Sequence, residues 1–180
     1  MLFVRTFFGR RPRRGFTFVS LLLCVSAGGI LLALLFPVYE RARDTATLRQ
    51  TLSDMAMWRD AMERYVSDHG AAPTNPNGKV RYKKPILREM LPYLDRVRSA
   101  DWWGGNYWIW TGAGTQEYGL SLTRPTDYLI VSLGKGCIRE NWRFDPVHPR
   151  AGYFEINGPS DFEKDVILWN GRFVRTPVIP

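Results

Sequence analysis

The feature that most constrains this chain is an uncharged stretch near its start. Phe16–Phe36 carries no charged side chain, and four arginines lie just before it, between residues 10 and 14. A helix over this stretch would be about 31 Å long, which matches the roughly 30 Å hydrocarbon core of a bilayer. Arginines beside such a run keep that end on the cytoplasmic side. The sequence therefore predicts one membrane-spanning helix, with everything after Tyr39 on the far side.

A secretory signal peptide is the first alternative to this anchor. The apolar run is longer than a usual signal core, and no small-residue A-x-A cleavage site follows it. Pro37, Val38 and Tyr39 instead lead straight into a charged, helical pattern. These features argue against a signal peptide, whereas a plain uncleaved signal anchor stays open.

Several short motifs around the stretch occur together. Arg14–Val19 (RGFTFV) joins a basic leader ending in glycine to Phe-Thr and an apolar helix, and Gly29-Ile30 and Pro37-x-Tyr39 follow. In this combination the chain resembles the type IV pilins and the pseudopilins of type II secretion, nearest the G type. The resemblance implies that a prepilin peptidase cuts between Gly15 and Phe16 and methylates the new amine.

The resemblance also implies that Ser20, Gly29 and Pro37 pack between subunits of a filament. Most family members carry a glutamate at the position of Ser20, and its carboxylate is thought to pair with a neighbouring subunit's N-terminal amine inside the membrane. A charge buried in lipid is costly and needs a partner. Serine cannot supply that ion pair, although its hydroxyl can bond back to a helix carbonyl. Whether the chain is a major, minor or tip subunit, or belongs to a divergent system, stays open.

From Glu40 to about His69 the pattern changes to an amphipathic helix. Apolar residues recur at three- and four-residue steps, with charged residues between them. The recurring residues are Leu48, Leu52, Met55, Met62, Tyr65 and Val66. Gly70, with Pro73 just beyond, predicts the end of the helix. We expect one rod with an apolar half and a striped half.

The remainder predicts one globular head. Pro85–Leu94 has the pattern of a short helix that begins at a proline. The expected strands are Tyr107–Thr111, Tyr118–Leu122, Tyr128–Leu133, Val166–Trp169 and Arg172–Val174. Asn170-Gly171 predicts a hairpin between the last two. We therefore expect an α+β fold in which a small antiparallel sheet lies against the C-terminal half of the long helix.

Two further motifs in this part strengthen the resemblance. Tyr65–Thr74 repeats the "Y-x-x-D-x-G-x-x-P-T" with which the stalk of G-type pseudopilins ends, and Asp101–Tyr107 (DWWGGNY) is similar to their "D-P-W-G-x-x-Y". The expected organisation is a leader over residues 1–15, a transmembrane helix over 16–39, a stalk helix over 40–70 and a head over 71–180.

The charge of the chain is mainly a topology signal. The 180 residues carry a formal net charge of +8, which could indicate a nucleic-acid partner. Five of the arginines lie in residues 1–15, so cleavage after Gly15 would leave +3 (8 − 5). That remainder is too small to claim a polyanion partner from charge. The balance disfavours nucleic acid.

No residues converge into a catalytic constellation. His69 and His148 are expected to be surface residues, and Cys137 with His148 is a thiol–imidazole pair without a family signature around it. A disulfide between Cys24 and Cys137 is geometrically disfavoured, and Cys137 is expected to be a buried small apolar residue. The sequence therefore predicts a protein that is not an enzyme.

Calcium enters through the resemblance. In the major pseudopilins a loop after Ser-Leu-Gly binds calcium through a backbone carbonyl and aspartates, which implies Leu133, Asp161 and Asp165 as candidate ligands here. Lys135-Gly136 stands where an aspartate would be expected, and a lysine opposes a cation that needs several oxygen ligands. An ordinary solvated acidic loop is the favoured alternative.

An aromatic cluster spans Trp102, Trp103, Tyr107, Trp108 and Trp110. Sugar binding or base stacking is one use for it. The alternation along Tyr107–Thr111 indicates that at least one face is buried, which favours a core or subunit contact.

These observations predict a structural subunit of a type IV pilus-like or type II secretion filament. The implied partners are prepilin peptidase, other pilin-like subunits, an inner-membrane assembly platform and membrane lipid. The implied location is the bacterial inner membrane, single-pass, with a periplasmic head, and then a filament. The alternative is a membrane-anchored periplasmic module that binds DNA or glycan; retention of the leader would favour it.

Overall fold

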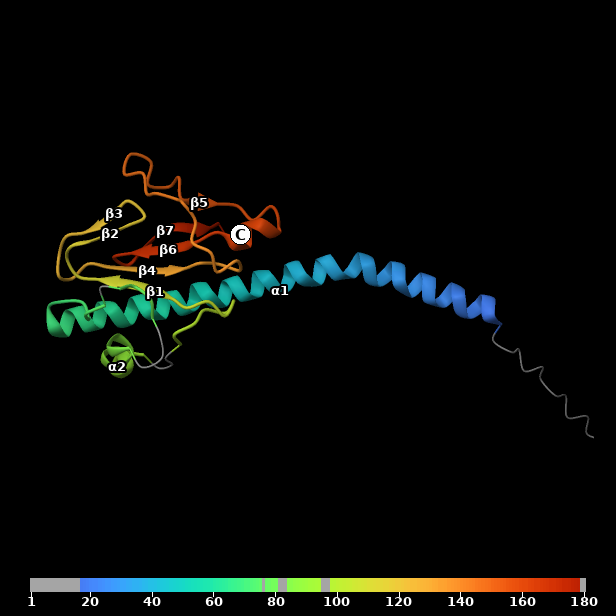
Figure 1. Ribbon diagram of the computed structural model, residues 1–180, viewed down its shortest axis with the longest axis horizontal. Helices are drawn as coiled ribbons and strands as arrows, with labels where there is room; N and C mark the ends of the chain where they lie inside the picture. Colours follow the sequence, from blue (N-terminus) through green and yellow to red (C-terminus); the bar gives the residue numbers. More distant parts are fainter. Residues whose placement is uncertain (1–16, 76, 81–83, 95–97, 179–180) are drawn as a thin grey trace, which may run out of the picture. The chain divides into compact units, whose positions relative to one another are not determined.

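The computed structural model describes residues 17–75, 77–80, 84–94 and 98–178 (Figure 1). The chain divides into two compact units, Met1–Glu40 and Arg41–Pro180. The expected leader over residues 1–15 and the expected processing site at Gly15 and Phe16 lie outside the described residues.

The expected long helix is confirmed, and it is α1 (Phe18–His69). It has 52 residues and continues through Pro37. Gly70 ends it in the left-handed conformation, with φ of 71°, and its N–H donates to the carbonyl of Val66 at 2.8 Å. Glycine adopts this conformation without the steric cost of a Cβ, which is why it ends helices so often.

The head begins on the later part of α1. From Arg41 onward the helix buries one face, on which Leu48, Met55, Trp58 and Met62 are each at most 4% exposed. Their spacing of three, four and seven residues is that of one stripe of an α-helix. The expected amphipathic pattern is confirmed here, and Trp58 joins the stripe.

A short helical segment follows the loop after α1. It was expected as one helix over Pro85–Leu94, and it consists of α2 (Pro85–Met90) and a 3₁₀ turn, η1 (Leu91–Tyr93). Pro92 has no N–H to donate to an α-helical ladder, so the α-helix stops at Met90 and the last turn tightens.

The strands form a five-stranded sheet in the order β1-β4-β6-β7-β5 and a separate hairpin, β2-β3 (Figure 1). All neighbours pair antiparallel except β5 and β7, which are parallel. The bounds are β1 (Trp108–Thr111), β2 (Thr115–Glu117), β3 (Leu120–Leu122), β4 (Tyr128–Ser132), β5 (Tyr153–Phe154), β6 (Val166–Trp169) and β7 (Arg172–Pro177).

Most of the strands match the sequence expectations, with two differences. The strand expected over Tyr118–Leu122 is confirmed only over Leu120–Leu122, because Tyr118 and Gly119 have φ of 55° and 75° and make the turn between β2 and β3. The second difference is β5, which was not expected. The hairpin at Asn170-Gly171 is confirmed, since it joins β6 to β7 with φ of 45° and 81°.

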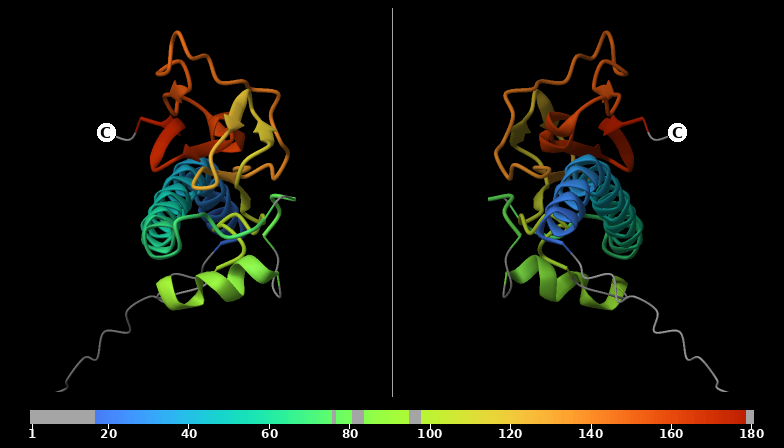
Figure 2. Two further views of the ribbon diagram at one scale, coloured as in Figure 1. Left: turned by 90° about the vertical axis from the view of Figure 1, so that its left-hand side faces the viewer. Right: turned by 90° about the vertical axis from the view of Figure 1, so that its right-hand side faces the viewer.

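The sheet has a hydrophobic cluster on each face because successive side chains of a strand point to opposite sides. Ile109, Ile130 and Leu168 join the cluster that includes the buried stripe of α1 and residues of α2. The neighbours Trp110, Leu129, Val131 and Ile167 join a second cluster on the other face, with residues of β2-β3. Within the head, α1 lies between the sheet and α2 (Figure 2).

The free side of β1 is covered by Asn75, Gly78 and Lys79. The N–H of Ile109 donates to the carbonyl of Gly78 at 2.6 Å, and the Asn75 side-chain amide donates to the carbonyl of Ile109 at 2.6 Å. Lys79 forms a β-bridge with Trp108. Asn75 is 4% exposed, so a buried amide takes the place of a neighbouring strand.

The turn that carries the DWWGGNY motif is organised by Asp101. This side chain is 1% exposed and accepts hydrogen bonds from the N–H groups of Trp103 and Gly105 at 3.0 and 2.8 Å. It also accepts one from the Ser132 hydroxyl at 2.7 Å. Burial raises the pKa of the Asp101 carboxyl, although these donors act in the other direction.

Candidate functional site

The first unit presents an uncovered apolar helix. The 18-residue window that makes α1 long and apolar enough to cross a membrane has none of its residues buried. Leu32, for example, is 71% exposed. Exposed apolar surface on this scale is a membrane or protein contact in most proteins. Lipid or neighbouring apolar helices could cover it.

The three residues expected to pack between filament subunits lie on this helix. Gly29 and Pro37 are exposed and Ser20 is half-buried. The Ser20 hydroxyl shares a hydrogen bond of 2.8 Å with the Thr17 hydroxyl, whereas Ser26 makes the bond back to a helix carbonyl, that of Leu22, at 2.8 Å. Filament packing itself stays a prediction for all three.

Thr17 is a residue that sequence reasoning missed. It immediately precedes α1, and its hydroxyl accepts from the N–H of Ser20 at 3.3 Å, as an N-cap threonine does. The signal was present, because threonine is a favoured capping residue just before an apolar helical run.

The second unit contains the acidic residues that were candidates for calcium. Asp161 lies in the 3₁₀ segment η2 (Pro159–Glu163), and its Oδ2 accepts from the N–H groups of Asn157 and Gly158, both at 2.8 Å. Its Oδ1 lies 2.6 Å from the Lys164 ammonium. The hydrogen bond from Lys164, followed by the two from the backbone, lowers the pKa of Asp161 to about 2.

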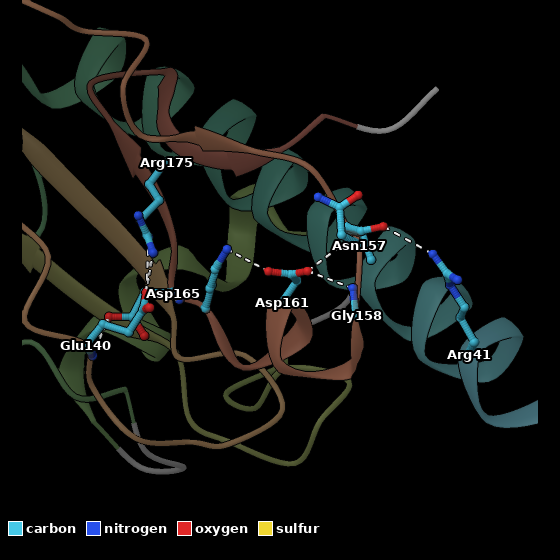
Figure 3. Close-up of polar contacts among 9 residues, drawn as sticks. Arg41, Glu140, Asn157, Gly158, Asp161, Asp165 and Arg175 are labelled. Atoms are coloured by element: carbon cyan, nitrogen blue, oxygen red, sulfur yellow. Dashed lines mark hydrogen bonds and ion pairs between the residues drawn. The ribbon is translucent and has the colours of Figure 1, made fainter. Parts of the chain in front are cut away.

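Asp165 belongs to a different group of contacts (Figure 3). It is fully buried, and its Oδ2 accepts from the Tyr118 hydroxyl at 2.9 Å and from the N–H of Glu140 at 3.0 Å. Glu140 returns the contact, since its Oε2 accepts from the N–H of Asp165 at 2.9 Å. Burial raises the pKa of Asp165 to about 6.

Arg175 of β7 completes this second group. Its Nη2 and Nε donate to Oε2 of Glu140 at 2.6 and 3.1 Å, and the residue is only 8% exposed. The guanidinium also lies 5.2 Å from the ring centroid of Trp142 and 5.4 Å from that of Phe154. Such flanking by rings favours a cation at this position.

Leu133 lies in the loop after β4, which approaches η2 closely. Lys135 donates its N–H to the carbonyl of Phe162 at 2.8 Å. A Cβ on Gly134 would lie 2.6 Å from that same carbonyl oxygen and 2.7 Å from the carbonyl oxygen of Lys164. Only glycine permits this approach of the two backbones.

This donor set does not fit a calcium ion in the arrangement observed. Calcium takes six to eight oxygen ligands. The structure instead divides Asp161 and Asp165 between two groups of contacts, and a lysine ammonium lies against the first (Figure 3). Within the described part of the chain, no three His, Cys, Asp or Glu side chains are placed to hold a metal. Calcium binding through Leu133, Asp161 and Asp165 stays a prediction.

The residues considered for catalysis contact different partners and do not contact one another. His69 stacks on Tyr65 with ring centroids 4.1 Å apart, and His148 lies 3.0 Å from Asp145 in an exposed loop. The expectation that Cys137 is buried is wrong. It has φ of 52° and is an exposed residue of the turn after Gly134.

The aromatic cluster belongs mainly to the hydrophobic interior. Tyr107 and Trp110 are 0% and 4% exposed, and Trp103 and Trp108 pack against the two clusters. Of the five, only Trp102 is an exposed side chain, and the Arg98 guanidinium lies 3.9 Å from its ring centroid. The expectation of a core use is confirmed for most of the cluster, which removes the main ground for a glycan- or DNA-binding face there.

An open hollow of about 510 Å³ lies elsewhere, over β2-β3 and the loop that carries Glu140. Its lining is mostly polar and includes Gln116, Ser121, Arg139, Asn141 and Trp142. Arg139 covers the Tyr118 ring at 4.3 Å from its centroid. None of the residues of the expected aromatic cluster lines this hollow.

Comparison with known proteins gives one informative result. The chain is 28% identical over 104 residues to the type II secretion system core protein G of Klebsiella michiganensis, covering 54% of this chain and 73% of that protein. The similarity is to a type II secretion protein. It supports the pseudopilin family, in agreement with the pilin-like α+β fold. No protein-family model matches the chain, and no solved structure matches it.

Sequence reasoning missed the cations of the head. Lys164 lies three residues after Asp161, so a local ion pair could have been expected. Arg175 and Glu140 are 35 residues apart, and no local pattern connects them.

Proposed function

We propose that this protein is a structural subunit of a type II secretion pseudopilus or a related type IV pilus-like filament. One observation carries the proposal, namely that a single 52-residue helix has two different parts. Its part in the first unit is apolar and uncovered, and its part in the second unit supplies a stripe of residues to the core of the head. A subunit of this kind can bundle its apolar segments while its heads remain folded. Similarity to a type II secretion core protein supports the same role.

The subunit would enter the inner membrane with its N-terminus in the cytoplasm and its head in the periplasm. The arginines before residue 15 supply the topology signal. Prepilin peptidase would then cut after Gly15 and methylate Phe16. An assembly platform in the inner membrane would extract the processed chain from lipid and add it to other pilin-like subunits. The proposed role includes no catalysis by this chain.

N-terminal mass spectrometry of protein co-expressed with a prepilin peptidase tests the processing step. The expected product begins at N-methylated Phe16, and Gly15→Leu should leave the leader in place because a bulky side chain occupies the cleavage position. Gly9→Leu is the matched control in the same leader and should still be processed. A wild-type chain that keeps Met1 in the presence of an active peptidase would contradict this step.

Sedimentation tests the assembly step separately. Processed wild-type protein should be recovered with sheared fibres, and Gly15→Leu protein should remain in the membrane fraction. Processed protein that never sediments with fibres would leave a membrane-anchored domain as the better description.

A further inference from the structure

We propose that the head uses its own cations, Lys164 and Arg175, where the resemblance implies a calcium ion, so that it folds and stays folded without a divalent metal. The inference concerns the head alone and does not depend on the proposed filament function.

The carboxylate of Asp161 already accepts three hydrogen bonds from groups of this chain. Its Oδ2 accepts two backbone N–H groups, which fixes the start of η2, and its Oδ1 accepts the Lys164 ammonium at 2.6 Å. The ammonium lies 4.7 Å from the centroid of the Phe154 ring. The Asp161 and Lys164 side chains are 14% and 31% exposed. A calcium ion at this carboxylate would have to displace the Lys164 ammonium, which is part of the same chain and therefore stays close to Asp161.

Glu140, which shares backbone hydrogen bonds with Asp165, is likewise supplied with a cation by the chain. Each carboxylate accepts the other residue's backbone N–H, so the two segments are joined in both directions. Two negative groups this close are stable only with a compensating charge or with one group neutral. Arg175 supplies the charge through two donors to Glu140, and its side chain is 9% exposed. The raised pKa of Asp165 reduces the remaining excess of negative charge once the pH falls to about 6.

Lys135 stands where the resemblance leads one to expect an aspartate, and it makes direct contacts on both sides. Its ammonium donates to Asp44 of α1 at 2.6 Å, and its N–H donates to Phe162 in η2. The loop after β4 is therefore bound to both of its neighbours by direct contacts. No metal is needed to join this loop to α1 and η2.

Thermal unfolding of the full chain in detergent micelles tests the proposal. The wild-type melting temperature should be the same in excess EDTA and in millimolar CaCl₂. A titration with CaCl₂ after chelation should show no saturable binding. A melting temperature that falls with EDTA and returns with calcium would overturn the proposal, as would saturable binding.

Matched variants test the cation itself. Lys164→Met removes the charge at similar length and should lower the melting temperature by about 3–6 °C. Arg150→Met is the control, because Arg150 is exposed and has no ion pair within the described part of the chain. An unchanged melting temperature for Lys164→Met would overturn the role of Lys164. If that variant fails to fold, the wild-type comparison in EDTA and calcium still decides the question. Both measurements are independent of leader cleavage and of fibre recovery.

Discussion

The ammonium of Lys135 donates to Oδ2 of Asp44 at 2.6 Å and so joins the loop after β4 to α1. Asp44 is the first buried residue of α1 within the head, at 8% exposed. The contact links residues 91 positions apart in the sequence.

The first prediction is that this pair stabilises the head modestly. The Lys135 side chain is 43% exposed, so solvent screens the interaction, and we expect Lys135→Met to reduce the free energy of unfolding by about 0.5–1 kcal/mol. Asp44→Asn and the double variant complete a mutant cycle by chemical denaturation. A coupling free energy of zero in that cycle would show that the pair contributes nothing.

The second prediction concerns the close approach of two backbones at Gly134. We expect Gly134→Ala to reduce the free energy of unfolding by roughly 3 kcal/mol or more, because its φ of 63° is strained for alanine and its Cβ would collide with two carbonyl oxygens. Gly112→Ala is the matched control. Its φ is 79°, and nothing lies within 4 Å of its Cβ, so only the conformational cost of about 1–2 kcal/mol applies. Equal losses in the two variants would mean that the contact with Phe162 and Lys164 is unimportant.

The third prediction is a pH dependence that comes from Asp165. Its pKa is raised to about 6 in the folded protein, from a value near 3.8 when it is exposed. Between about pH 4 and pH 6 the folded state therefore binds more protons than the unfolded state, and this group makes the head less stable as the pH rises through that window. The effect amounts to about 3 kcal/mol at most.

Thermal unfolding at about pH 4.5 and about pH 7 measures this effect, because the first value lies near the ordinary pKa of an exposed carboxyl and the second lies above the raised one. Asp165→Asn should flatten the profile, because an amide does not titrate. Asp161 does not interfere, since its pKa is lowered to about 2 and its contribution is lost only at pH values below that window. A pH profile that Asp165→Asn leaves unchanged would assign the slope to other groups, such as Asp101, whose pKa is also raised.

The fourth prediction rests on the proposed filament and concerns Ser20. Ser20→Glu should increase incorporation into filaments in a co-expression pull-down, if the missing ion pair with a neighbouring N-terminal amine limits assembly. Ser26→Glu is the control in the same apolar stretch, and it should reduce incorporation because its charge would have no partner in lipid. Unchanged incorporation of Ser20→Glu would count against a role for that ion pair.

The elements with a strong local pattern could be predicted from the sequence. The long helix follows from an uncharged run joined to an apolar stripe, and the β6-β7 hairpin follows from Asn170-Gly171, whose positive φ values suit a tight turn. The turn at Tyr118 was missed because a tyrosine with positive φ is uncommon, and β5 was missed because two residues carry no periodicity.

The polar contacts of the head could be predicted only in part. Asp161 and Asp165 stood out as acidic residues, but which partners they have depends on tertiary folding. The sheet brings Arg175 to Glu140, and the β2-β3 turn brings Tyr118 to Asp165. Those contacts join segments that are distant in sequence, so composition and spacing do not reveal them. The acidic residues alone could therefore suggest a metal site, although the chain provides its own cations there.

The cover over β1 has a consequence for how copies of this protein can associate. Unpaired N–H and C=O groups on an outer strand invite another chain to add itself as a further strand. Here Asn75 and Gly78 already satisfy both backbone groups of Ile109. Neighbouring molecules at high local concentration therefore cannot add a strand to this edge of the sheet. Any assembly at this edge has to rely on side-chain contacts, which can form and separate again.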